Sequence, residues 1–193
     1  MFAKRIFDFI VSALLLLFFG WAMLLFWLLA AIDTRSSGLF FQTRVGQFGR
    51  YFTIIKLRSM RDEGNTKQIS SYGRWMRKYK IDELPQFLHV FVGQMSLVGP
   101  RPDVPGYYDQ LQGEAREILK LKPGITSLAA LKYANEEAIL SKQADPLHYN
   151  DTVLFPDKVR MNLEYARHRR FSGDVRLLFA TFRTFTSDTH THE

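Results

Sequence analysis

Residues 9–32 have the sequence FIVSALLLLFFGWAMLLFWLLAAI, and none of these 24 side chains carries a formal charge. As a helix rising 1.5 Å per residue, the segment would be about 36 Å long. That is enough to cross the hydrocarbon core of a bilayer, which is about 30 Å thick. No face of the segment is polar, as one face of a surface helix would be. The segment therefore predicts a membrane anchor.

The run is too long for the apolar part of a typical signal peptide, and no convincing small-residue cleavage site follows it. Two topologies remain open. The helix either crosses the bilayer or bends midway and returns to the side it entered from. Basic residues lie at both ends, Lys4 and Arg5 before the segment and Arg35 after it, so the positive-inside rule does not choose between them. A bend needs a helix breaker, and Gly20 is the candidate.

The charge of the chain is concentrated after the anchor. The formal net charge is +7 and the pI is about 9.7, while Lys4, Arg5 and Asp8 are the only charged residues before Asp33. A basic domain indicates anionic partners such as phospholipid headgroups, nucleotides or nucleic acid. The absence of cysteine excludes disulfides and thiolate metal sites. We divide the chain into an anchor over residues 1–35 and one domain over residues 36–193.

The sequence after the anchor predicts a compact, mainly helical α+β domain. Two aromatic or β-branched runs around a Gly-rich turn predict a small β-hairpin within residues 38–60. The polar residues 61–71 predict a loop, and Leu128–Tyr133 a short strand. Pro85 disfavours α geometry at Leu84, which predicts a helix boundary or kink near Asp82–Leu84. Helices are expected at Tyr72–Lys80, Gln86–Phe91, Tyr107–Leu121, Glu136–Lys142, Asp157–Arg169 and Gly173–Phe185.

The last of these helices is amphipathic. Its apolar face consists of Val175, Leu177, Leu178, Phe179, Phe182 and Phe185. Arg176 and Arg183 lie beside that face. Such a helix can lie in the lipid headgroup region, with aromatic side chains inserted and arginines on anionic lipid. The alternative is that the same face packs on the domain core.

The strongest functional signal lies between Arg77 and Pro102. Asp82 and Glu83 are adjacent carboxylates that follow a group of basic residues. Consecutive side chains of a helix point in different directions, so one carboxylate could face a phosphate or metal while the other serves a second ligand. The alternative is that Asp82 is a helix N-cap and Glu83 a solvated acid of the first turn.

Basic residues supply candidate phosphate ligands. In the segment Gly99–Pro102 the two prolines restrict the backbone around Arg101, which could present its guanidinium to a diphosphate. Lys56 and Arg58 form a second basic group after the predicted hairpin. A surface turn and a solvated strand end are the simpler explanations of these two groups. His89, on an apolar helix, is expected to be a packed side chain, and no nucleotide-binding glycine loop or nucleophile elbow is present.

Several short motifs occur in a fixed order along nearly the whole chain. They are KRIFD at 4–8, KLRSM at 56–60, IDELPQ at 81–86, GQMSLVGPRP at 93–102 and KPGIT at 122–126. This ordered set resembles the small monotopic phosphoglycosyl transferases, bacterial sugar transferases that begin glycoconjugate and exopolysaccharide assembly on a polyprenol carrier. The resemblance implies a re-entrant membrane helix and a membrane-surface domain at the cytoplasmic face of the bacterial inner membrane.

The resemblance also implies a chemistry. Asp82 would be the nucleophile that attacks the β-phosphate of a UDP-sugar and releases UMP, and undecaprenyl phosphate would then take the sugar phosphate. Glu83 would activate this acceptor or position Mg²⁺, with Asp82 as a metal ligand. Arg101 is similar to the family's phosphate-binding arginine, and Lys56 and Arg58 are further phosphate-binding candidates. The expected partners are these substrates and anionic membrane lipids, not nucleic acid.

The chain departs from the family pattern at several positions. Gly20-Trp21 replaces a common Ser-Pro in the middle of the apolar segment, His89 a common asparagine, and Gln94 a common acidic residue. Ser127-Leu128 stands where Gly-Trp is familiar. These changes suggest a divergent subgroup with different sugar recognition, and the intact dyad and Arg101 imply an active enzyme. The alternative is a non-catalytic membrane-surface module that binds lipid or a partner of a polysaccharide assembly system.

Overall fold

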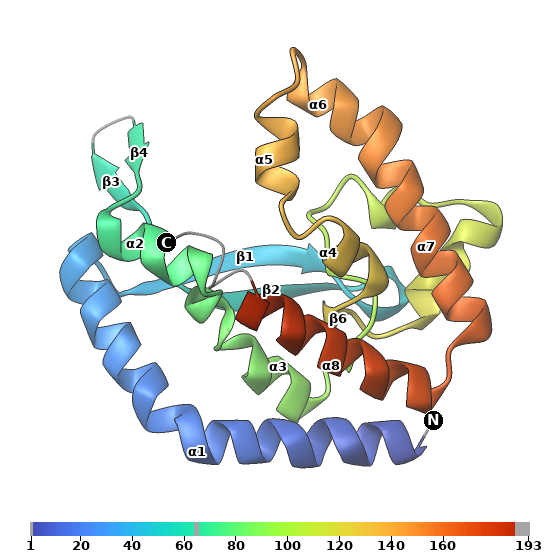
Figure 1. The fold of residues 1–193 in the computed structure, drawn as a ribbon, viewed down its shortest axis with the longest axis horizontal. Coiled ribbons are helices and arrows are strands. Elements are labelled where there is room, and N and C mark those ends of the chain that lie inside the picture. Colours follow the sequence, from blue (N-terminus) through green and yellow to red (C-terminus); the bar gives the residue numbers. More distant parts are fainter. Residues whose placement is uncertain (1, 64–65, 188–193) are drawn as a thin grey trace. The chain divides into compact units, whose positions relative to one another are not determined.

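The structure, a computed structural model, describes residues 2–63 and 66–187; of Glu63 and residues 185–187 it describes the backbone alone. The chain forms two compact units. The first consists of Met1–Arg44 with Tyr51–Met95, and the second of Val45–Arg50 with Ser96–Glu193. Figure 1 shows the elements of both, and each unit is described by itself. The helical elements outnumber the short strands, so the predicted mainly helical α+β class is confirmed.

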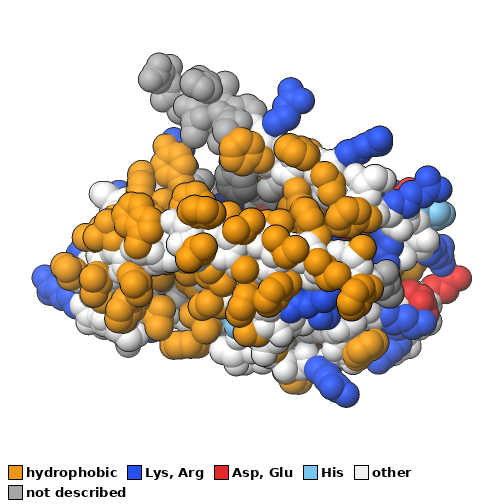
Figure 2. All heavy atoms as spheres, turned by 90° about the horizontal axis from the view of Figure 1, so that it is seen from below, with side chains coloured by type: hydrophobic (Ala, Val, Ile, Leu, Met, Phe, Trp, Pro, Cys, Tyr) orange, Lys and Arg blue, Asp and Glu red, His pale blue; other side chains and the backbone are white. Residues whose placement is uncertain are grey.

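The first unit begins with α1 (Phe2–Thr34), which contains the whole predicted apolar segment. Among the described residues, α1 is the one helix long and apolar enough to cross a membrane. Figure 2 shows hydrophobic side chains gathered on the side of the molecule where α1 lies. The exposed large apolar side chains of this helix include Leu14, Leu17, Phe18, Trp21, Leu24, Leu28 and Ile32. The chain remains helical through Gly20, and α1 is bent along its length (Figure 1).

The N-terminal end of α1 packs on α3 (Gln86–Val92). Arg5 donates hydrogen bonds to the carbonyl oxygens of Val90 at 2.6 Å and Phe91 at 2.7 Å. The rings of Phe9 and Phe91 stack with centroids 4.8 Å apart. These contacts tie the start of α1 to the helix that follows the Asp-Glu pair.

The C-terminal end of α1 contacts α2 (Ser71–Lys78) and the short strand β3 (Arg61–Glu63), which precedes α2 in the chain. Asp33 accepts hydrogen bonds from Arg61 at 2.7 Å and from the Ser70 hydroxyl at 2.6 Å. Ser70 is also the N-cap of α2, where its side chain accepts from the Gly73 amide. Both ends of α1 are therefore held by elements of the same unit.

The predicted β-hairpin is present as β1 (Leu39–Val45) and β2 (Tyr51–Leu57). Gly38 makes the turn from α1 into β1 with φ +72°. A Cβ atom at this position would lie 2.8 Å from the Ala31 nitrogen and the Trp27 oxygen. Glycine is therefore required by both the positive φ and the close approach.

The second unit is built around two short parallel strands, β5 (Ser96–Val98) and β6 (Gly124–Thr126). Ser96 lies opposite Gly124 and Val98 opposite Thr126. The 3₁₀ segments η3 (Tyr108–Gln110) and η4 (Gly113–Lys120) and the π-helix η5 (Asn150–Leu154) accompany them. The α-helices are α4 (Leu128–Lys132), α5 (Glu136–Leu140), α6 (Pro146–Tyr149), α7 (Phe155–His168) and α8 (Phe171–Ser187). Its core contains Val45, Tyr108, Leu111, Ile118 and Leu119, against which Phe155, Val159 and Leu163 of α7 pack.

Two sequence predictions of secondary structure were wrong in kind. The loop expected at 61–71 contains an antiparallel hairpin, β3 (Arg61–Glu63) and β4 (Thr66–Gln68). Asp62 lies opposite Lys67 there, a favourable cross-strand pair that apolar alternation does not reveal. The strand expected at Leu128–Tyr133 is helix α4, because Ser127 caps it by accepting from the Ala130 amide at 2.9 Å.

One further prediction was wrong in detail. The helix expected over Tyr107–Leu121 is split into η3 and η4, since Leu111 and Gln112 adopt extended backbone angles between them. The helix boundary predicted near Asp82–Leu84 is present, since a 3₁₀ turn ends at Glu83 and α3 begins at Gln86. Leu84 itself is right-handed helical, with φ −53° and ψ −37°, despite the proline that follows. Two hydrogen bonds hold Leu84 in this conformation. Its amide donates to the Ile81 carbonyl, and its carbonyl accepts from the Phe87 amide.

Helix α8 packs on the second unit on one side and leaves two aromatic side chains exposed. Leu177 is buried, and Thr181 shares a 2.8 Å hydrogen bond with Thr126 of β6, so one face packs on the unit. Phe179 and Phe182 are both exposed. The side chain of Phe185, assigned to the same apolar face, lies outside the described part of the chain.

Candidate functional site

Asp82 and Glu83 lie in a single 3₁₀ turn, η2 (Ile81–Glu83), between α2 and α3. The residue before this turn, Lys80, is left-handed, with φ 54° and ψ 24°. A non-glycine residue in this region stores strain, and such residues gather at functional sites. The left-handed residue ends the path of α2 and starts a new helical turn at the carboxylate pair. Its carbonyl accepts from the Glu83 amide at 3.1 Å, which fixes the turn.

The carboxylate of Asp82 is buried, and the residue is only 8% exposed. Its Oδ1 atom has no hydrogen-bond partner among the residues described. Burial raises the pKa of Asp82, the charge of Glu83 raises it further, and the nearby basic residues partly oppose this. A buried acceptor without a partner is costly to the fold, so this oxygen is the kind of atom that a ligand or reacting group satisfies.

Glu83 forms an ion pair with Lys56 of β2, with 2.9 Å between Nζ and Oε1. The two side chains are 11% and 18% exposed, respectively. The structure therefore brings Lys56 to the carboxylate pair. Arg58, the other candidate of that segment, instead donates to Asp62 at 2.9 Å and to the Leu39 carbonyl at 3.3 Å.

The helical path continues from η2 into α3, since Leu84 and Pro85 both have right-handed helical angles. Side chains four and seven residues apart share a face of such a path. Asp82, Gln86 and His89 follow this spacing, and all three are buried. The sequence analysis did not assign a role to Gln86, although the four-residue spacing from Asp82 was a signal that could have identified it.

His89 is a packed side chain, as the sequence predicted, and it joins α3 to β2. Its Nε2 atom accepts a hydrogen bond from the Ile55 amide at 3.2 Å. A neutral imidazole has one donor and one acceptor, so Nδ1 donates to Gln94 Oε1 at 2.7 Å. Two of the residues that depart from the family pattern, His89 and Gln94, thus contact each other, next to the strand that carries Lys56.

Arg101 belongs to the second unit, in the loop that follows β5. Pro100 accepts from the Gly124 amide at 2.8 Å, and Asp103 accepts from the Val45 amide at 2.9 Å. The loop is therefore ordered on both sides of Arg101, whose guanidinium donates to the Ile125 carbonyl at 3.4 Å. A small pocket beside it is lined by Val45, Gly46, Pro100, Arg101, Pro102, Tyr108, Ile118, Leu119, Leu121 and Pro123.

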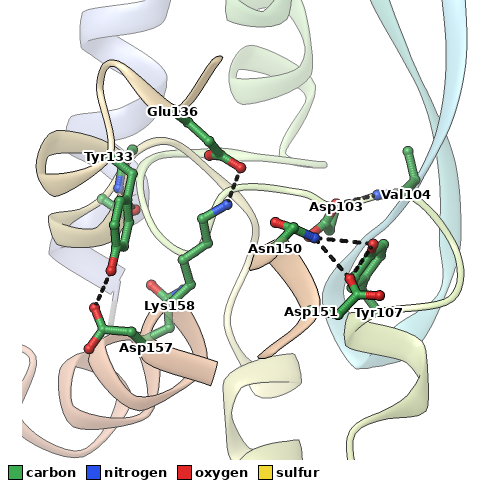
Figure 3. A network of polar contacts seen from close by, with 12 residues as sticks. Asp103, Val104, Tyr107, Tyr133, Glu136, Asn150, Asp151, Asp157 and Lys158 are labelled. Carbon is green, nitrogen blue, oxygen red and sulfur yellow. Dashed lines mark hydrogen bonds and ion pairs between the residues drawn. The ribbon is translucent and has the colours of Figure 1, made fainter. Parts of the chain in front are cut away.

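A polar network in the second unit holds the far end of this loop (Figure 3). The Tyr107 hydroxyl donates to Asp151 at 2.9 Å and accepts from Asn150 at 3.2 Å. Nearby, Tyr133 of the α4 end donates to Asp157 of α7 at 2.7 Å. Sequence reasoning missed this network, because its members are spread over residues 103–158 without a local pattern.

The sequence model of the bacterial sugar transferase family matches residues 1–188, and the chain belongs to that family. An undecaprenyl-phosphate glucose phosphotransferase of Komagataeibacter xylinus is 34% identical over 200 residues, covering 95% of this chain. An uncharacterized sugar transferase of Bacillus subtilis, EpsL, is 32% identical over 95% of this chain. A UDP-glucose:undecaprenyl-phosphate glucose-1-phosphate transferase of Escherichia coli is 29% identical, also over 95% of this chain.

The match covers a different share of the length of each relative. The match spans 36% of the Komagataeibacter protein and 40% of the Escherichia coli protein. It spans 87% of the Bacillus subtilis protein. The chain thus corresponds to part of the longer relatives and to nearly all of the shorter one.

Proposed function

We propose that this chain is a phosphoglycosyl transferase that moves a sugar 1-phosphate from a UDP-sugar to undecaprenyl phosphate and releases UMP. The observation that carries the proposal is the buried Oδ1 atom of Asp82, which has no partner among the described residues and lies next to a second carboxylate. The names of the relatives from Komagataeibacter and Escherichia coli, a glucose phosphotransferase and a UDP-glucose glucose-1-phosphate transferase, both acting on undecaprenyl phosphate, support the same substrate classes. The reaction would be the first membrane step of exopolysaccharide or glycoconjugate synthesis.

The reaction proceeds in two displacements at one phosphorus atom. A carboxylate oxygen of Asp82 attacks the β-phosphorus of the UDP-sugar, and the bond to the bridging oxygen breaks. UMP leaves with that electron pair, and a phosphoglycosyl-aspartate remains. An oxygen of undecaprenyl phosphate then attacks the same phosphorus, which frees the Asp82 carboxylate and gives undecaprenyl diphosphate-sugar. A covalent carboxylate intermediate divides one displacement between two anions into two steps.

The ion pair of Lys56 with Glu83 has a role in this scheme. The Lys56 ammonium offsets the Glu83 charge, so the pair presents less repulsion to an incoming diphosphate than two free carboxylates would. Glu83 activates the acceptor phosphate or helps to position a metal ion. Arg101 and Arg58 are proposed as further phosphate ligands.

Mg²⁺ fits the donor set at the carboxylate pair. Within residues 2–63 and 66–187, no group of three or more histidine, aspartate or glutamate side chains could hold a metal ion. Mg²⁺ commonly binds one or two carboxylates together with substrate phosphates, so Asp82 with Glu83 would suffice once the diphosphate is bound. The metal would neutralise phosphate charge and orient the diphosphate.

We further propose that α1 is re-entrant and that the chain lies at the cytoplasmic face of the bacterial inner membrane. The support is that Arg5 contacts α3 while Asp33 contacts Arg61 and the cap of α2, all within one unit. A straight crossing would place these two anchor points on opposite sides of the bilayer. In the second unit, the exposed Phe179 and Phe182 of α8 would enter the headgroup region beside its arginines.

The test is release of UMP by the purified full chain, supplied with a panel of UDP-sugars, Mg²⁺ and undecaprenyl phosphate. The wild type should release UMP, and Asp82→Asn should abolish the release. Glu117→Gln, which alters an exposed carboxylate paired with Lys120, is the matched control and should keep full activity. Intact mass spectrometry without acceptor should show a phospho-sugar adduct on the wild type. No release by the wild type with any UDP-sugar would favour the non-catalytic membrane-surface module.

A further inference from the structure

A second buried polar atom near Asp82, Nε2 of Gln86, has no hydrogen-bond partner among the described residues. Gln86 is 2% exposed, and its Nε2 atom makes no hydrogen bond within the described part of the chain. A buried donor left in this state destabilises the fold, because its lost hydrogen bond to water is not replaced. Buried side-chain amides in proteins are normally satisfied, so an orphaned one needs an explanation.

The position of Gln86 relates it to the carboxylate pair. Residues Ile81 to Gln86 follow one right-handed helical path, so Gln86 lies one turn after Asp82 on the same face. Its next polar neighbour on that face, His89, is already satisfied by Ile55 and Gln94. The face therefore presents an orphaned acceptor, Oδ1 of Asp82, one turn from an orphaned donor, Nε2 of Gln86.

We infer that Gln86 is a substrate-binding residue, whose Nε2 donates a hydrogen bond to a phosphoryl oxygen of the sugar-nucleotide diphosphate; this rests on the proposed function. The amide nitrogen of glutamine can only donate, and an incoming diphosphate consists of anionic acceptors. When Asp82 reacts with the phosphorus, the non-bridging oxygens of that phosphoryl group lie next to Asp82. They are therefore about one helical turn from Gln86. A donor that is buried before substrate arrives needs no reorganisation to stabilise them.

The experiment compares wild type with Gln86→Met in the full chain, purified in lipid nanodiscs. Methionine has a similar shape without the donor, so it removes the orphaned atom with little change in packing. The unliganded Tm of Gln86→Met should equal or exceed that of the wild type. Its kcat/KM for the UDP-sugar should fall about 10- to 100-fold, as expected for loss of a hydrogen bond to a charged group.

Asn162→Leu is the matched stability control. Asn162 is equally buried, but its amide donates to the Tyr108 hydroxyl at 2.7 Å, so loss of this side chain should lower the Tm. A Tm of Gln86→Met lowered like that of the control would show a structural hydrogen bond and overturn the inference. A kcat/KM reduced less than tenfold would overturn it as well.

The inference and the proposed function fail in different ways. A wild type that releases no UMP from any UDP-sugar rejects the proposed function, and the role of Gln86 with it. An active wild type with an equally active Gln86→Met rejects the role of Gln86 alone. Gln86→Glu keeps the size but replaces the donor by an acceptor, and it should lower kcat/KM further than methionine does, because its charge repels phosphate.

Discussion

The Asp82 carboxylate combines burial with a neighbouring negative charge. Both effects favour the protonated form in the folded chain, which is why the pKa is raised above its ordinary value. The favourable contribution to stability is therefore present at acidic pH and is lost as the pH rises through the raised pKa. Above the raised pKa, the ionised group stores energy in the folded state. This is the condition expected of the nucleophile that we propose.

Asp82→Asn should consequently raise the Tm at neutral pH while it abolishes transfer. The asparagine keeps the shape and removes the buried charge, so the difference in Tm from the wild type should widen from acidic to neutral pH. Differential scanning fluorimetry across that range measures it. A variant that is less stable than the wild type at neutral pH would show that the Asp82 charge is held by favourable contacts.

The ion pair between Lys56 and Glu83 is largely buried, so each partner depends on the other. Lys56→Met leaves the Glu83 charge with less compensation and should cost about 1–3 kcal/mol, somewhat less than breaking a fully buried pair. The double variant Lys56→Met, Glu83→Met should recover part of this loss in a denaturation experiment.

Lys120→Met breaks the exposed pair with Glu117 and is the control, with an expected loss below about 1 kcal/mol. Equal losses for Lys56→Met and Lys120→Met would mean that water screens the Glu83 carboxylate in solution. The coupling energy of the double-mutant cycle then would be close to zero.

Among the elements, the parallel pair of β5 and β6 joins two of the sequence motifs. The motifs GQMSLVGPRP and KPGIT meet because Gly99 and Gly124 have no side chains. A Cβ atom on Gly124 would lie 2.1 Å from the Gly99 nitrogen, and one on Gly99 would lie 2.4 Å from the Lys122 oxygen. Real Cβ atoms do not approach backbone so closely, so the strands must separate if either glycine is replaced.

Gly124→Ala should therefore lower the Tm, with a cost of about 1–3 kcal/mol or more as in other overpacked interiors. Gly173→Ala is the control, since Gly173 lies in α8 and no described atom outside its own stretch of helix lies within 4 Å of its Cβ position. Alanine is the better helix former, so the control should be neutral or stabilising by up to about 1 kcal/mol. Equal Tm values for the two variants would contradict the close contact between the strands at Gly99 and Gly124.

The element predictions that failed have a common cause. At Leu128–Tyr133 the capping hydroxyl of Ser127 outweighed the apolar pattern that suggested a strand. At Arg61–Gln68 a charged hairpin formed without apolar alternation, and Arg61 is held by Asp33 from outside the segment. Short segments such as these are decided by a few hydrogen bonds, and periodicity does not report those bonds.

On the scale of the whole molecule, the question is on which side of the membrane each end of α1 lies. The chain has no cysteine, so single cysteines can be introduced without a background. In a re-entrant arrangement, Ala3→Cys and Ser37→Cys should both react with a membrane-impermeant maleimide in inverted inner-membrane vesicles. Neither should react in right-side-out vesicles.

Phe18→Cys is the control for depth, because this exposed residue of the apolar segment should stay unlabelled in both kinds of vesicle. Labelling of Ala3→Cys and Ser37→Cys from opposite sides would establish a spanning helix. The contacts of Arg5 with α3 could not then form in the membrane, and the proposed location of the start of α1 would be wrong.

The sequence by itself determined the apolar anchor, the basic mainly helical domain, the β-hairpin and the carboxylate pair. These are local properties, since an uncharged run, an aromatic alternation or a motif such as IDELPQ is complete within a few neighbouring residues. The family membership follows from the order of such motifs, and the match over residues 1–188 agrees with it.

Only the tertiary structure decided which side chains are buried and what they contact. The pairing of Lys56 with Glu83 joins residues 27 positions apart, and the Ile55 amide meets His89 at a separation of 34. That Oδ1 of Asp82 and Nε2 of Gln86 lack a hydrogen-bond partner among the described residues is equally invisible in sequence. The physical reason is that burial and hydrogen bonding depend on where the backbone returns in space, and no pattern of neighbouring residues specifies that path.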